Sequence, residues 1–500
     1  MLKMTYKLSF VALALAAVLC VPSCGLFKHK QQSPTTGWNY NDPDYGGYEV
    51  KNVPEQETGP GLVFIEGGAF TMGRIAQDVM YDWNNTPRRV TVESFYMDET
   101  EVANVDYKEY LHWIRRVFVS YPEVYRKAMP DSLVWRSKLA YNEPLVETYL
   151  RHPSYNNYPV VGVSWLQAND YSSWRTDRVN ERIMIREGIL DNDPNQKDEN
   201  NFNTDAYLAG QYEGAVKQNL PSMDPNQEER RVMIEDGILL PKYRLATEAE
   251  WEYAALALIG NSFDERIYER KFYPWNGDIF RNYNKKYRGV MVANFKRGRG
   301  DMMGVAGALN DAGSSTLPVT SFWPNDYGLY CMAGNVNEWV LDVYRPMSFE
   351  DVEDFNPYRG NEFKVKATEE DGSLSQKDSL GRMKYVPIST EAALSQRRQF
   401  TKADYRNYED GDPGSTMDYA NEELKDAGSE KMYDPTQSLI NDHVRVYKGG
   451  SWNDLPYWLS PGARRFLAED QSRNDIGFRC AMIRVGAQSQ RHSTPTKAGR

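Results

Sequence analysis

Cysteine and histidine are scarce in this chain of 500 residues, which has four cysteines and five histidines. Cys20 and Cys24 belong to the N-terminal region, so Cys331 and Cys480 are the only thiols of the body. Two thiols are too few for a disulfide-stapled scaffold or a cysteine-rich zinc site. The histidines are His29, His112, His152, His443 and His492. Because they are widely spaced in the sequence, a histidine metal cluster is disfavoured.

Basic charge is also in deficit. The chain has 59 Lys and Arg against 70 Asp and Glu, a net charge of -11. Loss of residues 1–23 would remove two lysines and no acid, and -11 less 2 gives -13. Since nucleic-acid binding depends on cations that neutralise phosphates, this balance excludes a general nucleic-acid binder.

Long apolar runs are missing too. The longest one, residues 8–19, has about a dozen residues, whereas a membrane-spanning helix needs roughly 20. Lys3 and Lys7 flank its start, and Ser23-Cys24 follows it, a small residue directly before a cysteine. This pattern resembles a bacterial lipobox and predicts a lipoprotein signal peptide over 1–23, with lipid attached to Cys24. Cys20 is a weaker acceptor because bulky Leu19 precedes it; an ordinary secretory signal is the alternative.

The rest of the chain predicts one large domain with additions. Residues 24–60 are polar and lack periodicity, which indicates a tether, and residues 487–500 form a polar tail without a core pattern. Between them, 61–486 form the domain, interrupted by polar insertions at 191–230 and 351–441. Long loops in compact domains are often functional, so these insertions either recognise partners or only decorate the surface.

The domain mixes strand and helix signals. Residues 61–73 predict two short strands around a Gly-Gly turn, and Val90–Met97 alternates as one further strand. Helical spacing of apolar residues begins at Asn104. Two capping boxes, Ser164 with Gln167 and Thr247 with Glu250, announce two more helices.

Several ordered segments resemble the formylglycine-generating, sulfatase-modifying-factor family. They are Phe64–Gly73, Phe95–Val102, Pro159–Trp165, Arg244–Ala255, Tyr273–Trp275, Asn325–Val336 with Glu338 and Trp339, Arg445–Trp452 and Gly477–Arg479. The resemblance implies an α+β fold of the C-type-lectin-like kind, with low regular secondary structure and two prominent helices.

The resemblance also implies where a catalytic site would lie. Active members carry two cysteines after the Gly-Gly-Ser-Trp segment, and these thiolates bind the copper ion that activates oxygen. Here the two positions are Asp454 and Leu459. Neither a carboxylate nor an aliphatic side chain replaces a soft sulfur ligand, so we expect no catalytic residue, no catalytic cofactor and a pseudoenzyme.

Structural calcium is the metal that the resemblance leaves open. One site would use Asn294, the backbone of Phe295, Asp311 and the backbone of Gly313, all oxygen donors that suit calcium. A second would use position 331, the backbone oxygens of Gly334 and Val336, and Glu338. Because position 331 is a cysteine, the second site is weaker. Hydrogen-bonded loops are the alternative at both.

The two thiols of the body leave two alternatives open. In an oxidising compartment Cys331 and Cys480 would form a disulfide if their Cα atoms lie within about 7 Å; otherwise they are two buried free thiols.

A closer resemblance is to lipoproteins of the gliding-motility and type IX secretion machinery of Bacteroidota. It is carried by Asn41–Gly47, Asp82–Pro87, Pro130–Arg136, Tyr149–Pro153, Trp174–Glu181, Ile440–Trp452 and Tyr457–Leu459. It implies a protein anchored in the outer membrane by lipid, on the periplasmic face, with protein partners in that apparatus. The alternatives are an oxidase with an unorthodox site, or a module that binds carbohydrate or peptidoglycan.

Overall fold

The computed structural model describes residues 32–51, 55–73, 85–138, 140–259, 271–275, 277–297, 313–344, 364–387 and 443–486. The chain divides into two compact units. One combines the residues up to Val53 with Gln218–Asp236, and the other takes Pro54–Lys217 and the chain from Gly237 onward. None of the helices in the described ranges has the length and apolar character that a membrane span requires.

The smaller unit is held by polar contacts. Strands β5 (Leu220–Pro221) and β6 (Glu229–Arg230) pair antiparallel. The Arg230 guanidinium then bridges two carboxylates: Nη2 lies 2.7 Å from Glu49 Oε2 and 2.6 Å from Asp236 Oδ1. Part of the segment predicted as a tether is therefore tied to the end of the first insertion within this unit.

A four-stranded sheet of the larger unit joins the start of the domain to its end. Its order is β1-β4-β14-β7, with every neighbouring pair antiparallel. The strands are β1 (Leu62–Ile65), β4 (Phe95–Asp98), β14 (Cys480–Ile483) and β7 (Tyr243–Leu245).

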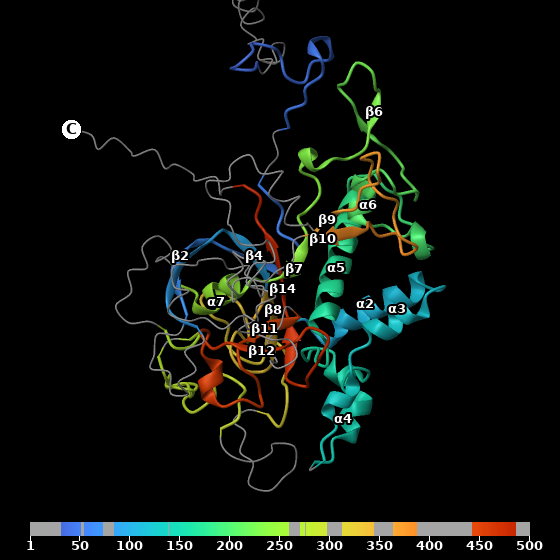
Figure 1. Cartoon of the computed structure of the whole chain (residues 1–500). Coiled ribbons are helices and arrows are strands. Elements are labelled where there is room, and N and C mark those ends of the chain that lie inside the picture. Colours follow the sequence, from blue (N-terminus) through green and yellow to red (C-terminus); the bar gives the residue numbers. More distant parts are fainter. Residues whose placement is uncertain are drawn as a thin grey trace, which may run out of the picture. The chain divides into compact units, whose positions relative to one another are not determined.

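A second four-stranded sheet carries the segments around the candidate site (Figure 1). Its order is β12-β11-β8-β13, and β13 runs parallel to β8. The strands are β12 (Arg465–Ala468), β11 (Val444–Lys448), β8 (Asn337–Val343) and β13 (Ile476–Phe478).

The prediction of a single strand over Val90–Met97 is wrong. The chain forms β3 (Arg88–Val92), which pairs with β2 (Gly68–Met72), and then β4, which pairs with β1. The two strands separate at Glu93-Ser94, where Ser94 Oγ accepts a hydrogen bond from Gly67 N at 2.9 Å. Alternation in the sequence continues across this break, so it could not reveal the change of sheet.

The three predicted helices are confirmed as α2 (Asn104–Val117), α5 (Trp165–Arg186) and α7 (Glu248–Leu256). Both capping boxes form: Ser164 Oγ accepts from Gln167 N at 3.3 Å, and Thr247 Oγ1 from Glu250 N at 3.1 Å. Shorter helices are α3 (Pro122–Ala128), α4 (Glu143–Thr148) and α6 (Thr204–Leu208).

These helices complete the core on different sides of the sheets. α2 packs on α5, where the rings of Tyr107 and Tyr171 stack with centroids 5.6 Å apart, and α5 also contacts β7. α7 lies between the β2–β3 pair and β8 (Figure 1), and all its residues are buried. The glutamates of α7 are therefore buried charges that need partners.

The described parts of the two insertions contact one another in the larger unit. Strands β9 (Lys364–Lys366) and β10 (Tyr385–Pro387) of the second insertion pair antiparallel and lie beside α6 of the first (Figure 1). Tyr385 Oη donates to Asp205 Oδ2 at 2.7 Å, and Gln211 Nε2 donates to the Ser375 carbonyl at 3.0 Å. Insertions that are far apart in sequence thus form one joint surface element.

Candidate functional site

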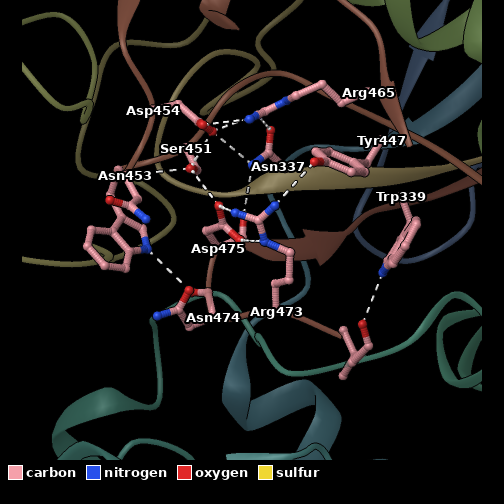
Figure 2. Close-up of polar contacts among 12 residues, drawn as sticks. Asn337, Trp339, Tyr447, Ser451, Asn453, Asp454, Arg465, Arg473, Asn474 and Asp475 are labelled. Atoms are coloured by element: carbon pink, nitrogen blue, oxygen red, sulfur yellow. Dashed lines mark hydrogen bonds and ion pairs between the residues drawn. The ribbon is translucent and has the colours of Figure 1, made fainter. Parts of the chain in front are cut away.

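Asp454, which the family resemblance places at the first copper-ligand position, lies in a buried ionic cluster (Figure 2). Arg465, the first residue of β12, donates from Nη1 to Oδ1 and from Nη2 to Oδ2, both at 2.6 Å. Ser451 Oγ and Asn337 Nδ2 also donate to Oδ2, at 2.6 and 3.1 Å. Burial raises the pKa of Asp454, but the bonds and charge of Arg465 outweigh it and hold the pKa below its usual value.

A second carboxylate, Asp475, completes this cluster. Figure 2 shows Ser451 between the two aspartates, with its Oγ 3.3 Å from Asp475 Oδ2. Arg473 Nη2 donates to the same oxygen at 3.0 Å. Burial raises the pKa of Asp475; Arg473 opposes this, and the charge of Asp454 adds to it. Ser451 and Asp475 are fully buried, so the cluster is a closed ion-paired network rather than an open reaction site.

The Gly-Gly turn after β11 positions this cluster. Gly450 has φ +70°, and a Cβ there would lie 2.9 Å from the Trp458 carbonyl oxygen. Only glycine tolerates both the left-handed conformation and this approach. The turn delivers Ser451 to the two carboxylates and sends the chain into the short 3-10 helix Pro456–Leu459.

Leu459, which the resemblance places at the second copper-ligand position, ends that short helix and has no exposed surface. Its side chain belongs to an apolar cluster with Met291, Ala293, Phe295 and Ala333. Thus one of the two positions is an ion pair and the other is hydrocarbon packing. Neither side chain supplies the thiolate that a soft metal ion prefers.

The two remaining thiols are free and buried, which corresponds to the second of the two alternatives drawn from the sequence. Cys480 Sγ lies 3.4 Å from Ser172 Oγ, and Cys331 Sγ lies 3.5 Å from the Val319 carbonyl oxygen. Burial raises the pKa of both thiols, that of Cys480 to about 12. Thiols so far from ionisation are poor nucleophiles and metal ligands.

Glu338, the only carboxylate of the weaker calcium site, already accepts hydrogen bonds from other side chains. Arg479 donates from Nε to Oε2 at 2.6 Å and from Nη2 to Oε1 at 2.7 Å, and Trp251 Nε1 donates to Oε2 at 2.7 Å. Glu338 and Arg479 are both buried. The charge that would bind calcium is already neutralised, so Glu338 with Gly334, Val336 and Cys331 fits a calcium ion poorly.

The stronger calcium site fits better. Asn294 is fully buried, and its Oδ1 has no hydrogen-bond partner, while its Nδ2 donates to the Ser315 carbonyl at 2.8 Å. An unpartnered buried oxygen is costly unless a cation or water satisfies it. Phe295 and Gly313 lie in the described chain, whereas Asp311 lies outside it. Asn294 Oδ1 is thus an oxygen donor available to a cation or a water, which is consistent with the donor set that the resemblance implies.

The histidines of the described ranges do not converge. His112 and His152 are exposed, and His443 Nδ1 lies 2.9 Å from Glu469 Oε1 on the surface. The same ranges contain no group of three or more His, Cys, Asp or Glu residues that could hold a metal ion. Cys24, His29 and His492 lie outside the described residues.

Two features of the larger unit went unnoticed in the sequence. The first is a buried charge network in which Lys448 Nζ lies 3.1 Å from Glu248 Oε1 and 2.9 Å from Glu252 Oε2, while Arg464 Nε donates to Glu248 Oε1 at 2.7 Å. The second is a cavity of about 310 Å³ between the segments 274–292 and 322–333. The sequence does carry a signal for the cavity, because those segments are enriched in apolar and aromatic residues. It carries no signal for the charge network, because the members of the network are far apart in the sequence.

Fold and site together define an α+β domain in which Asp454 and Leu459, the positions that the resemblance assigns to copper ligands, hold no thiol. The family of sulfatase-modifying factor enzyme 1-like domains matches residues 48–387. This chain belongs to that family, and the predicted fold class is confirmed.

Relatives in this family include both active and inactive proteins. The formylglycine-generating enzyme of Mus musculus is 25% identical over 335 residues, which cover 61% of this chain and 66% of the enzyme. The inactive C-alpha-formylglycine-generating enzyme 2 of the same species is 24% identical over 312 residues, covering 57% of this chain and 70% of that protein. The chain spans only 57% of the length of the bovine formylglycine-generating enzyme.

Among solved structures, PvdO from Pseudomonas aeruginosa is similar at 17% identity with a TM-score of 0.39, covering 84% of this chain and 94% of that one. A variable protein of Treponema denticola is similar at 16% identity with a TM-score of 0.35, covering 84% of this chain and 94% of that one.

Proposed function

We propose that this chain is a non-catalytic lipoprotein of the outer membrane that serves as an assembly component of the type IX secretion and gliding-motility machinery. The segments that carry the closer resemblance point to the gliding-motility lipoprotein GldJ of Bacteroidota. GldK, also called PorK, is the alternative assignment. Protein partners of that apparatus would be its ligands, with peptidoglycan as a further candidate.

The observation that carries the non-catalytic part of the proposal is the pairing of Asp454 with Arg465, beside a fully buried Leu459. Copper chemistry in this family needs two thiolates at these positions. Here one position is neutralised by a guanidinium and the other is packed among apolar side chains. The inactive relatives among the matched proteins support the same view.

The anchoring part of the proposal rests on Cys24. Lipid attached there would hold the protein on the periplasmic face of the outer membrane, because several acyl chains anchor stably where a single one binds marginally. A calcium ion at Asn294 would then have a structural role, since its hard oxygen donors offer no redox chemistry.

A copper titration tests the non-catalytic part. Purified protein is titrated anaerobically with Cu(I) against a colorimetric chelator, and oxygen uptake is then followed with a thiol reductant. We expect no thiolate–copper absorption and no oxygen uptake above that of copper alone. The formylglycine-generating enzyme of Thermomonospora curvata, a 25% identical relative, is the positive control. Oxygen uptake in proportion to bound copper would instead establish an oxidase with an unorthodox site.

A deletion tests the assembly part. Removal of the gene should abolish both type IX secretion and gliding, and the wild-type gene should restore both. A Cys24→Ser variant tests the anchor, because it should lose labelling by a fatty-acid analogue and leave the outer-membrane fraction. If the deletion strain secretes and glides normally, the assembly function is wrong.

A further inference from the structure

The cavity of about 310 Å³ is walled by aromatic side chains. Trp275 and Phe322 line it, together with Tyr283 and Trp323, whose side chains are 69% and 45% exposed. Large aromatic side chains left in water on a monomer mark interaction sites when they gather around a concave surface. The gathering here combines two segments that are far apart in the sequence.

Cations lie on one side of this cavity in a chain that is otherwise acidic. Residues 281–297 contain six basic residues and no acidic one, while the whole chain has a net charge of -11. Arg281 lines the cavity, and Lys285, Lys286 and Arg288 are exposed in the loop that follows it. Within the part of the chain that the structure describes, none of these four cations forms an ion pair. A local field of this kind attracts an anionic partner.

The loop that carries these cations is fixed at the rim of the cavity. Arg281 and Met291 form a β-bridge, and Asn282 N donates to the Val290 carbonyl at 2.8 Å, so the loop folds back on itself. At its tip the ring of Tyr287 packs edge-on against the cavity wall residue Trp323, with centroids 5.4 Å apart. The cations are thus held beside the aromatic wall.

The polar groups of the lining argue against a saccharide. Sugar sites need free directional donors and acceptors, and often carboxylates. Here the lining contains no acidic residue. Asn325 Oδ1 already accepts from Tyr327 N and Leu329 N, and Asn282 Oδ1 accepts from Asn284 N. Besides the Trp275 Nε1–H, which has no hydrogen-bond partner among the described residues, the lining offers mainly aromatic surface and positive charge.

We propose that this cavity is a docking site for an acidic peptide segment of a partner protein. One aromatic or large aliphatic side chain of the segment would enter between Trp275 and Trp323, and its flanking carboxylates would meet the four cations of the rim. The nature of the partner, a protein, rests on the proposed assembly function; the chemistry of the site rests on the cavity and its charges.

Binding of a defined probe to the purified full-length chain tests this site. The probe is a short dye-labelled peptide in which a central tryptophan is flanked by aspartates and glutamates, followed by fluorescence anisotropy. One control peptide has lysines in place of the acids, and another has alanine in place of the tryptophan. We expect the acidic tryptophan peptide to bind, added salt to weaken the binding, and both control peptides to fail.

Variants of the chain assign the binding to this cavity. Arg281→Glu and Trp323→Ala should each weaken the affinity about tenfold, since one reverses a rim charge and the other removes an aromatic wall. Lys197→Glu, the same charge reversal on an exposed lysine of the first insertion, should leave it unchanged. Trp323 and Arg281 are exposed, so both variants should fold, and their thermal unfolding curves verify this.

Three results would overturn the docking site. They are no binding of the acidic peptide, equal binding of the lysine peptide, and Trp323-dependent binding of a neutral chito-oligosaccharide in place of the peptide. The outcome is separable from the proposed function. A secretion defect on deletion without peptide binding removes only the docking site, whereas peptide binding without a secretion defect removes only the assembly function.

Discussion

Arg465 encloses Asp454 with two hydrogen bonds of 2.6 Å, and its Nη2 also donates to Asn337 Oδ1 at 2.5 Å. The guanidinium thereby joins β12 to β8 across β11. It also lies over the ring of Tyr447 in β11, 4.9 Å from the ring centroid, so one side chain contacts all three strands. Asp454 and Arg465 are therefore part of the structural core.

Removal of the arginine should be costly. In Arg465→Met the Asp454 carboxylate stays buried without its charged partner, and breaking a buried pair from one side costs about 3–5 kcal/mol. Urea unfolding should show a loss of this size. Arg136→Met, which breaks an exposed pair with Glu143, is the matched control and should change the stability far less, because solvent screens that pair. Equal effects would mean that the Asp454 pair is not structural.

The neighbouring leucine allows an equally direct comparison. Leu459 has no exposed surface, whereas Leu455, four residues earlier, is 49% exposed. Leu459→Ala should lose about 2–5 kcal/mol of unfolding free energy, because a cavity opens beside Met291 and Phe295. Leu455→Ala should change it by about 0.5 kcal/mol or less. A small loss at Leu459, measured by urea unfolding, would contradict the packing described for it.

Local signals in the sequence predicted much of this fold. The capping boxes of Ser164 and Thr247 placed two helix starts correctly, because a cap is decided by residues within one turn. The change of sheet after Val92 was missed, because it depends on partners far away in the sequence. Element types follow from local chemistry, whereas strand pairing follows from the whole chain.

The candidate site divides in the same way. The family resemblance singled out Asp454 and Leu459, but it could not supply Arg465 and Asn337 as partners of the aspartate. Nor did it indicate that Arg479 neutralises Glu338. These partners are chosen by tertiary packing, which single-sequence patterns do not encode.

A buried aspartate of β8 gives the protein a distinctive pH response. Burial, followed by the charge of Glu248, raises the pKa of Asp342 to about 7, although its Oδ2 accepts from Glu248 N at 2.6 Å. The ordinary pKa of an aspartate, which applies in the unfolded chain, is 3.8. Between pH 3.8 and about 7 the folded protein therefore binds more protons at Asp342 than the unfolded chain does. The contribution of Asp342 to stability should therefore fall as pH rises through this window, by up to about 1.4 kcal/mol per pH unit.

Asp342→Asn removes that dependence while keeping an oxygen for the Glu248 N–H. The stability of the wild type relative to this variant should decrease from pH 4 to about 7 and then level off. Chemical unfolding across this range measures it. A flat difference for Asp342→Asn would mean that the group is ionised throughout.

The contact between the two insertions has a testable anchor in Gln211. Its Nε2 donates to the Ser375 carbonyl at 3.0 Å, and its Oε1 accepts from Lys377 N at 2.7 Å. Gln211→Ala should weaken protection of residues 364–387 in hydrogen exchange by about 1–3 kcal/mol and leave the sheets unaffected. Gln227→Ala, at an exposed glutamine of the smaller unit, should change nothing there. If hydrogen exchange of residues 364–387 is unchanged in Gln211→Ala, the two insertions do not stabilise one another through this contact.

The thiols provide a test that needs no substitution. Because Cys331 and Cys480 are free and buried, iodoacetamide should label neither in the native protein and both after denaturation without reductant. Peptide mapping by mass spectrometry reports each site separately, so Cys24 does not interfere. Since burial raises the pKa of both thiols, native labelling should remain slow even at pH 9. If labelling requires prior reduction, the two cysteines instead form a disulfide. In that case the contacts of their sulfurs with Ser172 and Val319 are wrong.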